Sequence, residues 1–426
     1  MKTKKIIITA WMLEVKGYSI WIEAQKWIKI FNDMGFRIEL IHGRNPKYSF
    51  LNRENKTLLN LQTKLFNKKI SYSQFIKNVA FLDVYQKTYD LFERKWQKEK
   101  YILVAENTFG PALNIPYTKA LFDVINKNKI PTIARIHDFY VNFYTKHDAQ
   151  IKDSLPELKK IFQAQSNYIE KVFINKSDLQ QARKRKMKNI YLIPNGFDFN
   201  TKIKIRQPII EKLKKRINLQ ASEVIFLQPT RIITRKRIED LIYIISELKK
   251  RTKWNFKLLI AGGFKEYNPE AIHYQDKIIS LSKKNQIPLF ILKDLGILFE
   301  IQEAYYLADF ITLLSQEEGF GLPVLESCAY KKMLIVRRFP RFSVFENLRE
   351  GNFQFIETKN QTHPWQWKKQ ELTNFCQKII DWQTQNNKEK TKILQKNYQL
   401  AKTNFSLDLS KIELKKVLDG AQNINL

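Results

Sequence analysis

The chain has 426 residues, of which 44% are hydrophobic and 13% aromatic, and this composition is typical of a globular protein. Its length allows at least two domains, and its apolar runs fall short of the roughly 18 to 20 residues that a membrane-spanning helix needs. Only Cys328 and Cys376 are present, so no disulfide framework is expected, and the cytoplasm is the favoured compartment.

The formal net charge is +32, which nucleic acid, an anionic membrane surface or an anionic small substrate would each explain. A composition rich in Lys, Asn and Ile, as expected from an AT-rich genome, explains it with no partner. No helix-turn-helix, zinc or RNP-type motif accompanies the charge, so specific nucleic-acid binding is not expected. The basic clusters at 183–186 and 212–216 are interpreted as solvated faces. The alternative is peripheral attachment to an anionic surface at the inner face of the membrane.

In the first half, apolar runs typical of strands alternate with amphipathic helical segments. The predicted strands are 5–9, 37–41, 101–105, 132–136, 171–174 and 190–193. A helix is predicted from about Ser19 to Met34, ended by Gly35, and residues 50–100 are predicted to be largely helical. This alternation indicates a parallel sheet covered by helices on both faces, in a domain spanning residues 1–198.

A polar, lysine-rich stretch at 199–221 interrupts the pattern, which then restarts. Strands are predicted at 224–227, 256–260, 289–292, 310–314 and 334–336, with a helix at 238–248 and further helices from Gln370 onward. We expect a second α/β domain at 222–395 and a C-terminal helix at 396–426 that packs back on the first domain. Both domains would be Rossmann-like and face each other across a cleft, where the strand C-termini bind ligands.

The most informative motif is SQEEGFGLPVLESCA at 315–329, predicted as a strand end, a glycine turn and a helix. Gly319 and Gly321 allow the backbone to approach a ligand closely, and Pro323 suits a first helical turn. The helix would direct unpaired N–H groups toward the turn and so favour phosphate. With Glu318 at the turn and Glu326 inside the helix, the motif can hold a ligand rich in hydroxyls that also carries phosphate.

A second motif, QPTRIITRKR at 228–237, follows the first strand of the second domain. A short loop separates Arg231 from Lys236, so both can reach one diphosphate, Arg by a forked contact and Lys as a mobile charge. Arg235 and Arg237 are expected to face solvent. The alternative is a basic loop on a basic protein, which is less favoured if the Glu318 turn lies at a neighbouring strand end.

Two further candidates lie in the first domain. Gly17, in the turn after the first strand, permits close backbone approach, although a tight turn would need a glycine in any case. His137 stands at the end of the predicted strand 132–136. No HExxH motif, Cys/His cluster or Asp-x-Asp pair is present, so no metal is expected.

The segment YLADFITLLSQEEGFGLPVLES resembles the signature of retaining glycosyltransferases of family 4, which have the GT-B fold. The resemblance extends to Pro229-Thr230-Arg231 with Lys236, to IPNGFD at 193–198 and to His137-Asp138. Within that family, the segments AENTFGPALNIP, TIARIHDFY and QPTRIITRKRIE are similar to mannosylglucosylglycerate synthases.

The resemblance implies a metal-independent, retaining transfer of a hexose from a UDP- or GDP-linked donor to a hydroxyl acceptor, which would be a small molecule, a glycan or a glycolipid. No cofactor beyond the nucleotide-sugar co-substrate is implied. Glu326 would bind the ribose hydroxyls and Glu318 the donor sugar. Arg231 and Lys236 would neutralise the departing diphosphate. The alternative is an inactive relative that acts as a partner, or a subunit that binds a glycan or a membrane surface.

The remaining roles implied by the resemblance concern the turns. The residues of the glutamate motif that would bind the donor through the turn are Gly319, Phe320, Gly321 and Leu322. His137 would contact the donor sugar near the reacting carbon, and Gly17 would line the acceptor and phosphate side. The chain departs from the family at the first turn, which has one glycine, and at Tyr330-Lys331-Lys332, where relatives usually have a glycine.

Overall fold

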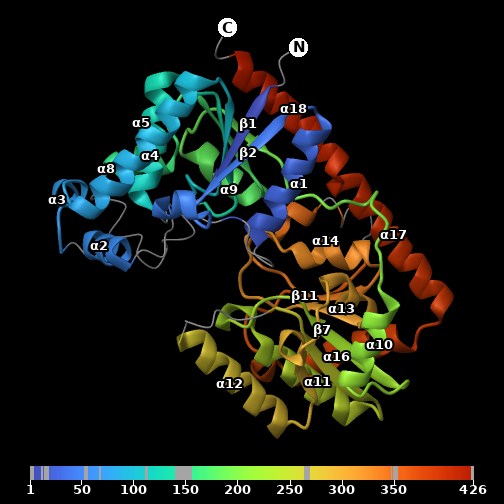
Figure 1. The fold of residues 1–426 in the computed structure, drawn as a ribbon. Helices are drawn as coiled ribbons and strands as arrows, with labels where there is room; N and C mark the ends of the chain where they lie inside the picture. Colours follow the sequence, from blue (N-terminus) through green and yellow to red (C-terminus); the bar gives the residue numbers. More distant parts are fainter. Residues whose placement is uncertain are drawn as a thin grey trace. The chain divides into compact units, whose positions relative to one another are not determined.

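The structure, a computed structural model, describes residues 4–10, 13, 19–51, 56–66, 69–110, 114–139, 156–262, 269–346, 348 and 354–423. The chain divides into two compact units (Figure 1). The first unit comprises residues 1–195 and 407–426, and the second comprises residues 196–406. Each unit is built around its own sheet.

The sheet of the first unit has six parallel strands in the order β2-β1-β3-β4-β5-β6. They are β1 (Lys5–Ala10), β2 (Arg37–His42), β3 (Ile102–Glu106), β4 (Thr132–Ile136), β5 (Ile169–Phe173) and β6 (Ile190–Leu192). The predicted strands of this half are therefore confirmed, with ends that differ by one or two residues.

Helices cover both faces of this sheet because successive side chains of a strand point to opposite faces. Ile7 of β1 packs in a cluster with residues of α4 (Val79–Lys98) and α5 (Ile115–Asn128). Its neighbours Ile6 and Ile8 pack on the other face with α1 (Ser19–Asp33) and α18 (Leu407–Asn423). Figure 1 shows α18 lying along the sheet of the first unit, far in sequence from the strands it covers.

Further helices lie in the described part of the first unit. They are η1 (Pro46–Leu51), α2 (Lys56–Phe66), α3 (Tyr72–Ile76), α8 (Pro156–Phe162) and α9 (Lys176–Lys184). The predicted end of α1 is confirmed, since Gly35 has a φ of 79° and its N–H donates to the carbonyl of Asn32.

The second sheet also has six parallel strands, in the order β12-β11-β10-β7-β8-β9. They are β7 (Glu223–Gln228), β8 (Asn255–Ile260), β9 (Leu289–Ile291), β10 (Phe310–Leu313), β11 (Met333–Arg337) and β12 (Ile356–Thr358). The sequence predicts all of these except β12, a three-residue strand at the sheet edge.

One face of this sheet packs against α11 (Ile238–Arg251), α12 (Pro269–Lys284) and α16 (Lys369–Thr384). Strands β7, β10 and β11 also contact α13 (Ile301–Leu307) and α14 (Leu322–Ala329), and α14 in turn packs on α17 (Asn387–Phe405). The remaining elements are α10 (Gln207–Arg216), η2 (Thr234–Lys236), η3 (Leu292–Leu295), η4 (Phe342–Phe345) and η5 (Pro364–Gln366). Helix α10 lies inside the stretch predicted to interrupt the pattern, and it buries Ile210 and Leu213.

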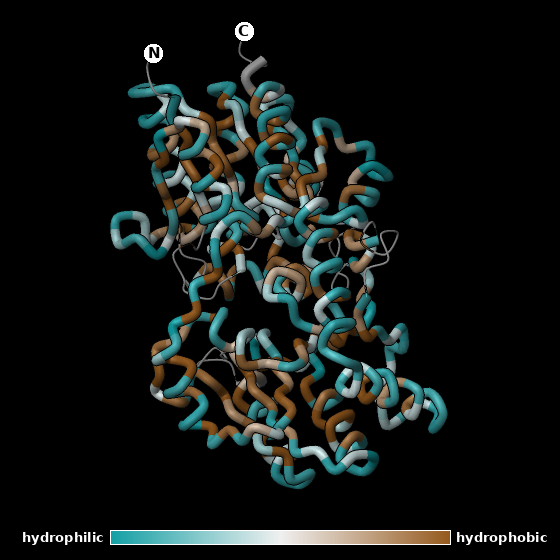
Figure 2. Tube along the Cα trace, turned by 90° about the vertical axis from the view of Figure 1, so that its right-hand side faces the viewer, coloured by the Kyte–Doolittle hydropathy of each residue, from teal (hydrophilic) through white to brown (hydrophobic). Residues whose placement is uncertain are grey.

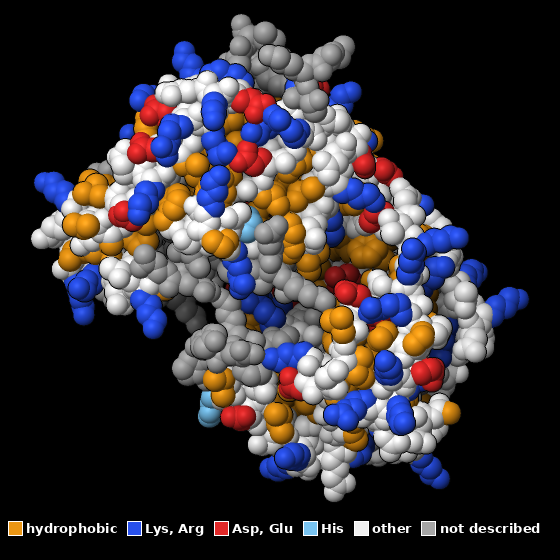
Figure 3. Space-filling view, in the orientation of Figure 1, with side chains coloured by type: hydrophobic (Ala, Val, Ile, Leu, Met, Phe, Trp, Pro, Cys, Tyr) orange, Lys and Arg blue, Asp and Glu red, His pale blue; other side chains and the backbone are white. Residues whose placement is uncertain are grey.

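The hydrophobic strands run through the interior of each unit, and hydrophilic residues dominate the outer loops and helix faces (Figure 2). Lys and Arg side chains are spread over the face shown in Figure 3. Among the described residues, no helix has both the length and the apolar character that crossing a membrane requires.

Candidate functional site

The order of the second sheet reverses between β7 and β10, which pair directly although β8 and β9 lie between them in sequence. In open parallel sheets, ligands bind at the carboxyl ends of the strands at such a reversal. The loop after β7 carries Arg231 and Lys236, and the loop after β10 carries Glu318. The predicted placement of these two motifs at neighbouring strand ends is confirmed.

A buried ion pair joins the two loops. The Nζ atom of Lys236 lies 2.5 Å from Oε1 of Glu318, and Nη1 of Arg235 lies 3.5 Å from Oε2 of the same carboxylate. Lys236 and Glu318 are only 5% and 7% exposed. The pair therefore places charged groups in a region that little water reaches, where their effect on a ligand is strong.

Burial and neighbouring charges shift the pKa of both Lys236 and Glu318. Burial lowers the pKa of Lys236 to about 8, the positive charges of Arg235 and Arg231 add to this, and Glu318 opposes it. Burial tends to raise the pKa of Glu318, but the charges of Lys236 and Arg235 outweigh it and hold this pKa below its usual value. An anion that entered beside Lys236 would relieve the repulsion among the three cations.

The prediction that Arg237 faces solvent is wrong, whereas Arg235 does reach solvent in part. Arg235 is half-exposed, but its Nη1 donates to the carbonyl of Glu317 at 2.6 Å, which ties the β7 loop to the β10 loop. Arg237 is largely buried and adopts a φ of 54° at the start of α11, where it pairs with Asp240 at 3.5 Å. Arg235 thus holds the two loops together because the two strand ends are adjacent, whereas Arg237 contacts Asp240 and His363.

The glutamate motif folds as predicted, with β10, a glycine turn and helix α14. Gly321 has a φ of 95°, and a Cβ atom added to it would lie 2.7 Å from Cζ of Phe339. Pro323 stands in the first turn of α14, where its missing N–H costs no hydrogen bond. The N-terminus of α14 therefore begins directly at the turn that contains Glu318.

Glu326 lies in the second turn of α14 and is partly exposed. Its Oε2 accepts a hydrogen bond of 2.5 Å from Oη of Tyr305 on α13. The Tyr305 ring is completely buried and stacks on Tyr330 at a centroid distance of 4.5 Å. Tyr305 was not predicted as a site residue, because the sequence alone did not show that α13 lies against α14.

Two further residues that shape these loops were also missed. Arg341 is nearly buried, and its Nη1 donates to the carbonyl of Glu318 at 3.1 Å and pairs with Glu317 at 3.2 Å. Gly262, just after β8, lies so close to the β7 loop that a Cβ atom would stand 2.2 Å from the carbonyl oxygen of Thr230. A glycine directly after a strand was the available signal for Gly262.

His137 follows β4 in the first unit, as predicted, and is part of a buried polar network. Its Nε2 lies 2.9 Å from Oε2 of Glu106, whose Oε1 lies 3.3 Å from Nη1 of Arg135. Arg135 also pairs with Glu23 at 3.0 Å. Burial tends to raise the pKa of Glu106, but Arg135 and His137 hold it below its usual value. The charged Glu106 therefore orients the His137 ring through Nε2.

The predicted residue Gly17 lies outside the described residues. Within the described ranges, no group of three or more His, Cys, Asp and Glu side chains is placed to hold a metal ion. The structure thus brings Lys236 and Glu318 into contact and places Glu326 on the helix that follows. His137 belongs to the first unit.

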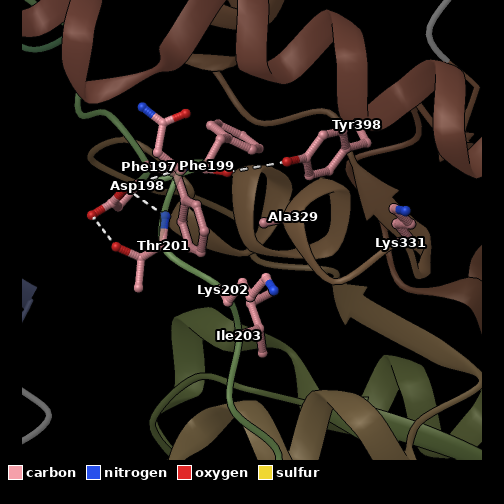
Figure 4. A pocket seen from close by; sticks show the side chains of 10 residues that line it. Phe197, Asp198, Phe199, Thr201, Lys202, Ile203, Ala329, Lys331 and Tyr398 are labelled. Carbon is pink, nitrogen blue, oxygen red and sulfur yellow. Dashed lines mark hydrogen bonds between the residues drawn. The ribbon is translucent and has the colours of Figure 1, made fainter.

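A separate cavity of about 300 Å³ lies beside the C-terminus of α14 (Figure 4). Its lining residues are Phe197, Asp198, Phe199, Asn200, Thr201, Lys202, Ile203, Ala329, Lys331 and Tyr398. The Asp198 carboxylate accepts from Thr201 Oγ1 at 2.8 Å, and Tyr398 Oη donates to the Phe199 carbonyl at 3.1 Å. These groups satisfy one another, and we interpret them as an anchor for the chain segment after β6.

Comparison with known proteins adds independent information. Residues 209–361 match the model of the family described as glycosyl transferases group 1. A mannosylglucosylglycerate synthase from Petrotoga mobilis is 26% identical over 357 residues, which cover 77% of this chain and 80% of the relative. An enzyme of the same name from Thermotoga maritima is 23% identical over 345 residues, covering 75% of this chain and 78% of the relative.

Solved structures are similar over nearly the whole chain. A glycosyltransferase from Rickettsia africae has a TM-score of 0.65 at 18% identity, covering 100% of this chain and 99% of its own. Sucrose-phosphate synthase from Thermosynechococcus elongatus has a TM-score of 0.67 at 14% identity and 98% coverage of each chain. HepE from Anabaena, solved with UDP and glucose, has a TM-score of 0.64 at 14% identity, covering 98% and 99%. These likenesses confirm the predicted fold of two Rossmann-like domains.

Proposed function

Because this chain is a group 1 glycosyltransferase with a GT-B fold, an enzyme that takes its sugar from a nucleotide donor, we propose the finer details of its reaction. It transfers a hexose from a UDP- or GDP-linked donor to a hydroxyl acceptor, retains the anomeric configuration and requires no metal ion.

The observation that carries this proposal is the buried ion pair of Lys236 with Glu318, flanked by Arg235 and Arg231, at the ends of β7 and β10. Negative charge builds on the diphosphate as the glycosyl bond breaks. Fixed cations in a buried region stabilise that charge most in the transition state. Lys236 and Arg231 thus supply the charge neutralisation that a divalent cation supplies in other transferases.

The acidic residues of the glutamate motif bind hydroxyls. Glu318, held by Lys236 and Arg235, accepts hydrogen bonds from the donor sugar, and Glu326 accepts them from the ribose. The amides at the start of α14 hold sugar or phosphate oxygens, since the N-terminus of a helix favours anions. His137 contacts the donor sugar near the reacting carbon, with its ring oriented by Glu106.

The names of the relatives indicate which substrates to test first. Two relatives are named mannosylglucosylglycerate synthases, which supports a mannosyl donor and a small acceptor that carries a glycerate. One similar structure was solved with UDP-glucose, which supports a UDP-linked glucose donor as the second choice. An acceptor with a carboxylate would also suit a chain of net charge +32.

The first test is binding of UDP and GDP by calorimetry to the wild type and to the Arg231→Ala and Lys236→Ala variants. We expect the nucleotide that the wild type binds to lose at least tenfold in affinity in each variant. Equal affinity in wild type and both variants would falsify the proposed diphosphate site.

The second test is transfer itself. We expect GDP-mannose or UDP-glucose to be consumed in EDTA at an unchanged rate, and NMR of the product to show the anomeric configuration of the donor. Loss of transfer in EDTA that Mg²⁺ restores contradicts metal independence, and an inverted product contradicts retention. Nucleotide binding without any hydrolysis or transfer would instead favour an inactive, glycan-binding relative.

A further inference from the structure

The hydroxyl of Tyr305 donates a hydrogen bond to the carboxylate of Glu326. The Oη–Oε2 distance is 2.5 Å, and the phenol is completely buried while Glu326 is partly exposed. A phenylalanine ring would fill nearly the same space, so packing alone does not explain the hydroxyl. A buried phenol that donates to a partly exposed carboxylate therefore serves to orient that carboxylate.

Tyr305 is itself held in place from two sides. Its ring stacks on Tyr330 at 4.5 Å with an interplanar angle of 23°. Helix α13 is fixed by Glu303, which pairs through both oxygens with Arg206 at 2.7 and 3.0 Å and caps the helix at Glu300. The donor that faces Glu326 is thus attached to a rigid element, which is what a group that positions another requires.

The phenol also remains a donor whenever the site is in use. Burial raises the pKa of Tyr305 well above its usual value, and the negative charge of Glu326 raises it further. A neutral phenol bonded to one carboxylate oxygen fixes the plane of the carboxylate while leaving its negative charge. A carboxylate so oriented can accept hydrogen bonds from two neighbouring hydroxyls of one ligand.

We propose that Tyr305 is a positioning residue that orients Glu326 for the ribose 2′- and 3′-hydroxyls of the nucleotide, and that it thereby sets the discrimination between ribonucleotides and their deoxy analogues. This inference rests on the proposed function, which assigns Glu326 to the ribose. The Tyr330 ring contributes by holding Tyr305 in its orientation.

The test compares nucleotides that differ only in a ribose hydroxyl. Dissociation constants are measured by calorimetry for UDP and its 2′- and 3′-deoxy analogues, and for GDP and the matching analogues. In the wild type, we expect loss of a hydroxyl to weaken binding by about 10- to 100-fold, the range for a hydrogen bond to a charged group. We call the dissociation constant of the deoxynucleotide divided by that of the ribonucleotide the ratio. In Tyr305→Phe, we expect the ratio to fall below about threefold, because ribonucleotide binding weakens while deoxynucleotide binding barely changes.

Three controls separate positioning from general structure. Tyr306→Phe removes a hydroxyl from the same helix at an exposed position and should leave the ratio at its wild-type value. Adding Tyr305→Phe to Glu326→Gln should lower the ratio no further than Glu326→Gln does alone. Tyr330→Leu keeps the Tyr305 hydroxyl but removes the stacked ring, and should lower the ratio by about threefold, which also tests the inference if the Phe variant does not fold.

The outcomes test the positioning role of Tyr305 separately from the proposed function. A Tyr305→Phe variant that weakens ribo- and deoxynucleotides equally, with the ratio unchanged, overturns the positioning role and leaves the proposed function standing. A wild type that binds neither UDP nor GDP overturns both.

Discussion

The turn before α14 depends on Gly321 in two ways, through its backbone conformation and through the space beside it. The residue has a φ of 95°, a conformation that side chains with a Cβ rarely adopt. The added Cβ would also lie 2.7 Å from Cζ of Phe339, a buried ring that packs on Phe342. We therefore expect Gly321→Ala to cost backbone energy and packing energy together.

The two contributions have different sizes. The left-handed backbone costs a residue with a Cβ about 1–2 kcal/mol, partly offset by about 0.4–1 kcal/mol from the stiffer unfolded chain. Overpacking against a ring that is held on several sides costs about 1–3 kcal/mol. We expect Gly321→Ala to lower the free energy of unfolding by about 1–5 kcal/mol.

Gly296 supplies a matched control in the same unit. Its φ is 68°, and no atom lies within 4 Å of an added Cβ, so Gly296→Ala carries the backbone cost alone. Urea unfolding followed by circular dichroism measures both variants, and the slope with denaturant should stay constant. Equal losses for Gly321→Ala and Gly296→Ala would refute the packing argument. A recovery in Gly321→Ala/Phe339→Leu would locate the clash at the ring.

The remaining predictions concern the neighbouring loops. Gly262→Ala places a Cβ atom 2.2 Å from the carbonyl oxygen of Thr230 and should therefore shift the loop that carries Arg231. We expect calorimetry to show at least tenfold weaker binding of the preferred nucleotide, UDP or GDP. Unchanged binding would contradict this prediction. Because the pKa of Lys236 is about 8 and a bound diphosphate would raise it, affinity for that nucleotide should fall as pH rises from 8 to 10, by at most tenfold per unit. In Lys236→Met, we expect this fall in affinity between pH 8 and pH 10 to disappear. Identical pH profiles in wild type and variant would refute the assignment of the fall to Lys236. Lys331→Gly should stabilise the chain by about 0.5–1 kcal/mol in urea unfolding, since Lys331 has a φ of 51° after α14, whereas Lys331→Ala should not stabilise it.

Much of the fold could be predicted because its central strands are buried on both faces. Such strands are continuous apolar runs, and β1, β7 and β10 are clear examples. Helix α10 was not predicted because Ile210 and Leu213 are its only buried apolar residues, too few for a helical pattern to be recognised. Strand β12 has three residues and pairs with one neighbour only, so its sequence carries too short a pattern to recognise.

The main part of the candidate site could be predicted because it depends on local sequence and strand order. Strand, glycine turn and helix follow one another within one segment, so Glu318 and Gly321 could be placed from the motif alone. The ion pair of Lys236 with Glu318 required one further inference, that the two motifs end neighbouring strands. Tyr305 could not be found this way, because its contact with Glu326 depends on how two helices pack.

Buried charges that hold the loops are the hardest part to predict, and Arg337 explains why. Its position at the end of an apolar strand suggests a side chain that reaches solvent, yet it is fully buried. Its Nη1 donates to the carbonyl of Leu314 at 2.6 Å, and its Nη2 pairs with the buried Asp240 at 2.5 Å. These partners lie 23 and 97 residues away in sequence, and together with the carbonyls of Asn360 and Thr362 they make the burial tolerable. Since Leu314 directly follows β10 and Asp240 lies in the first turn of α11, Arg337 fixes the two segments that carry Glu318 and Lys236 relative to each other.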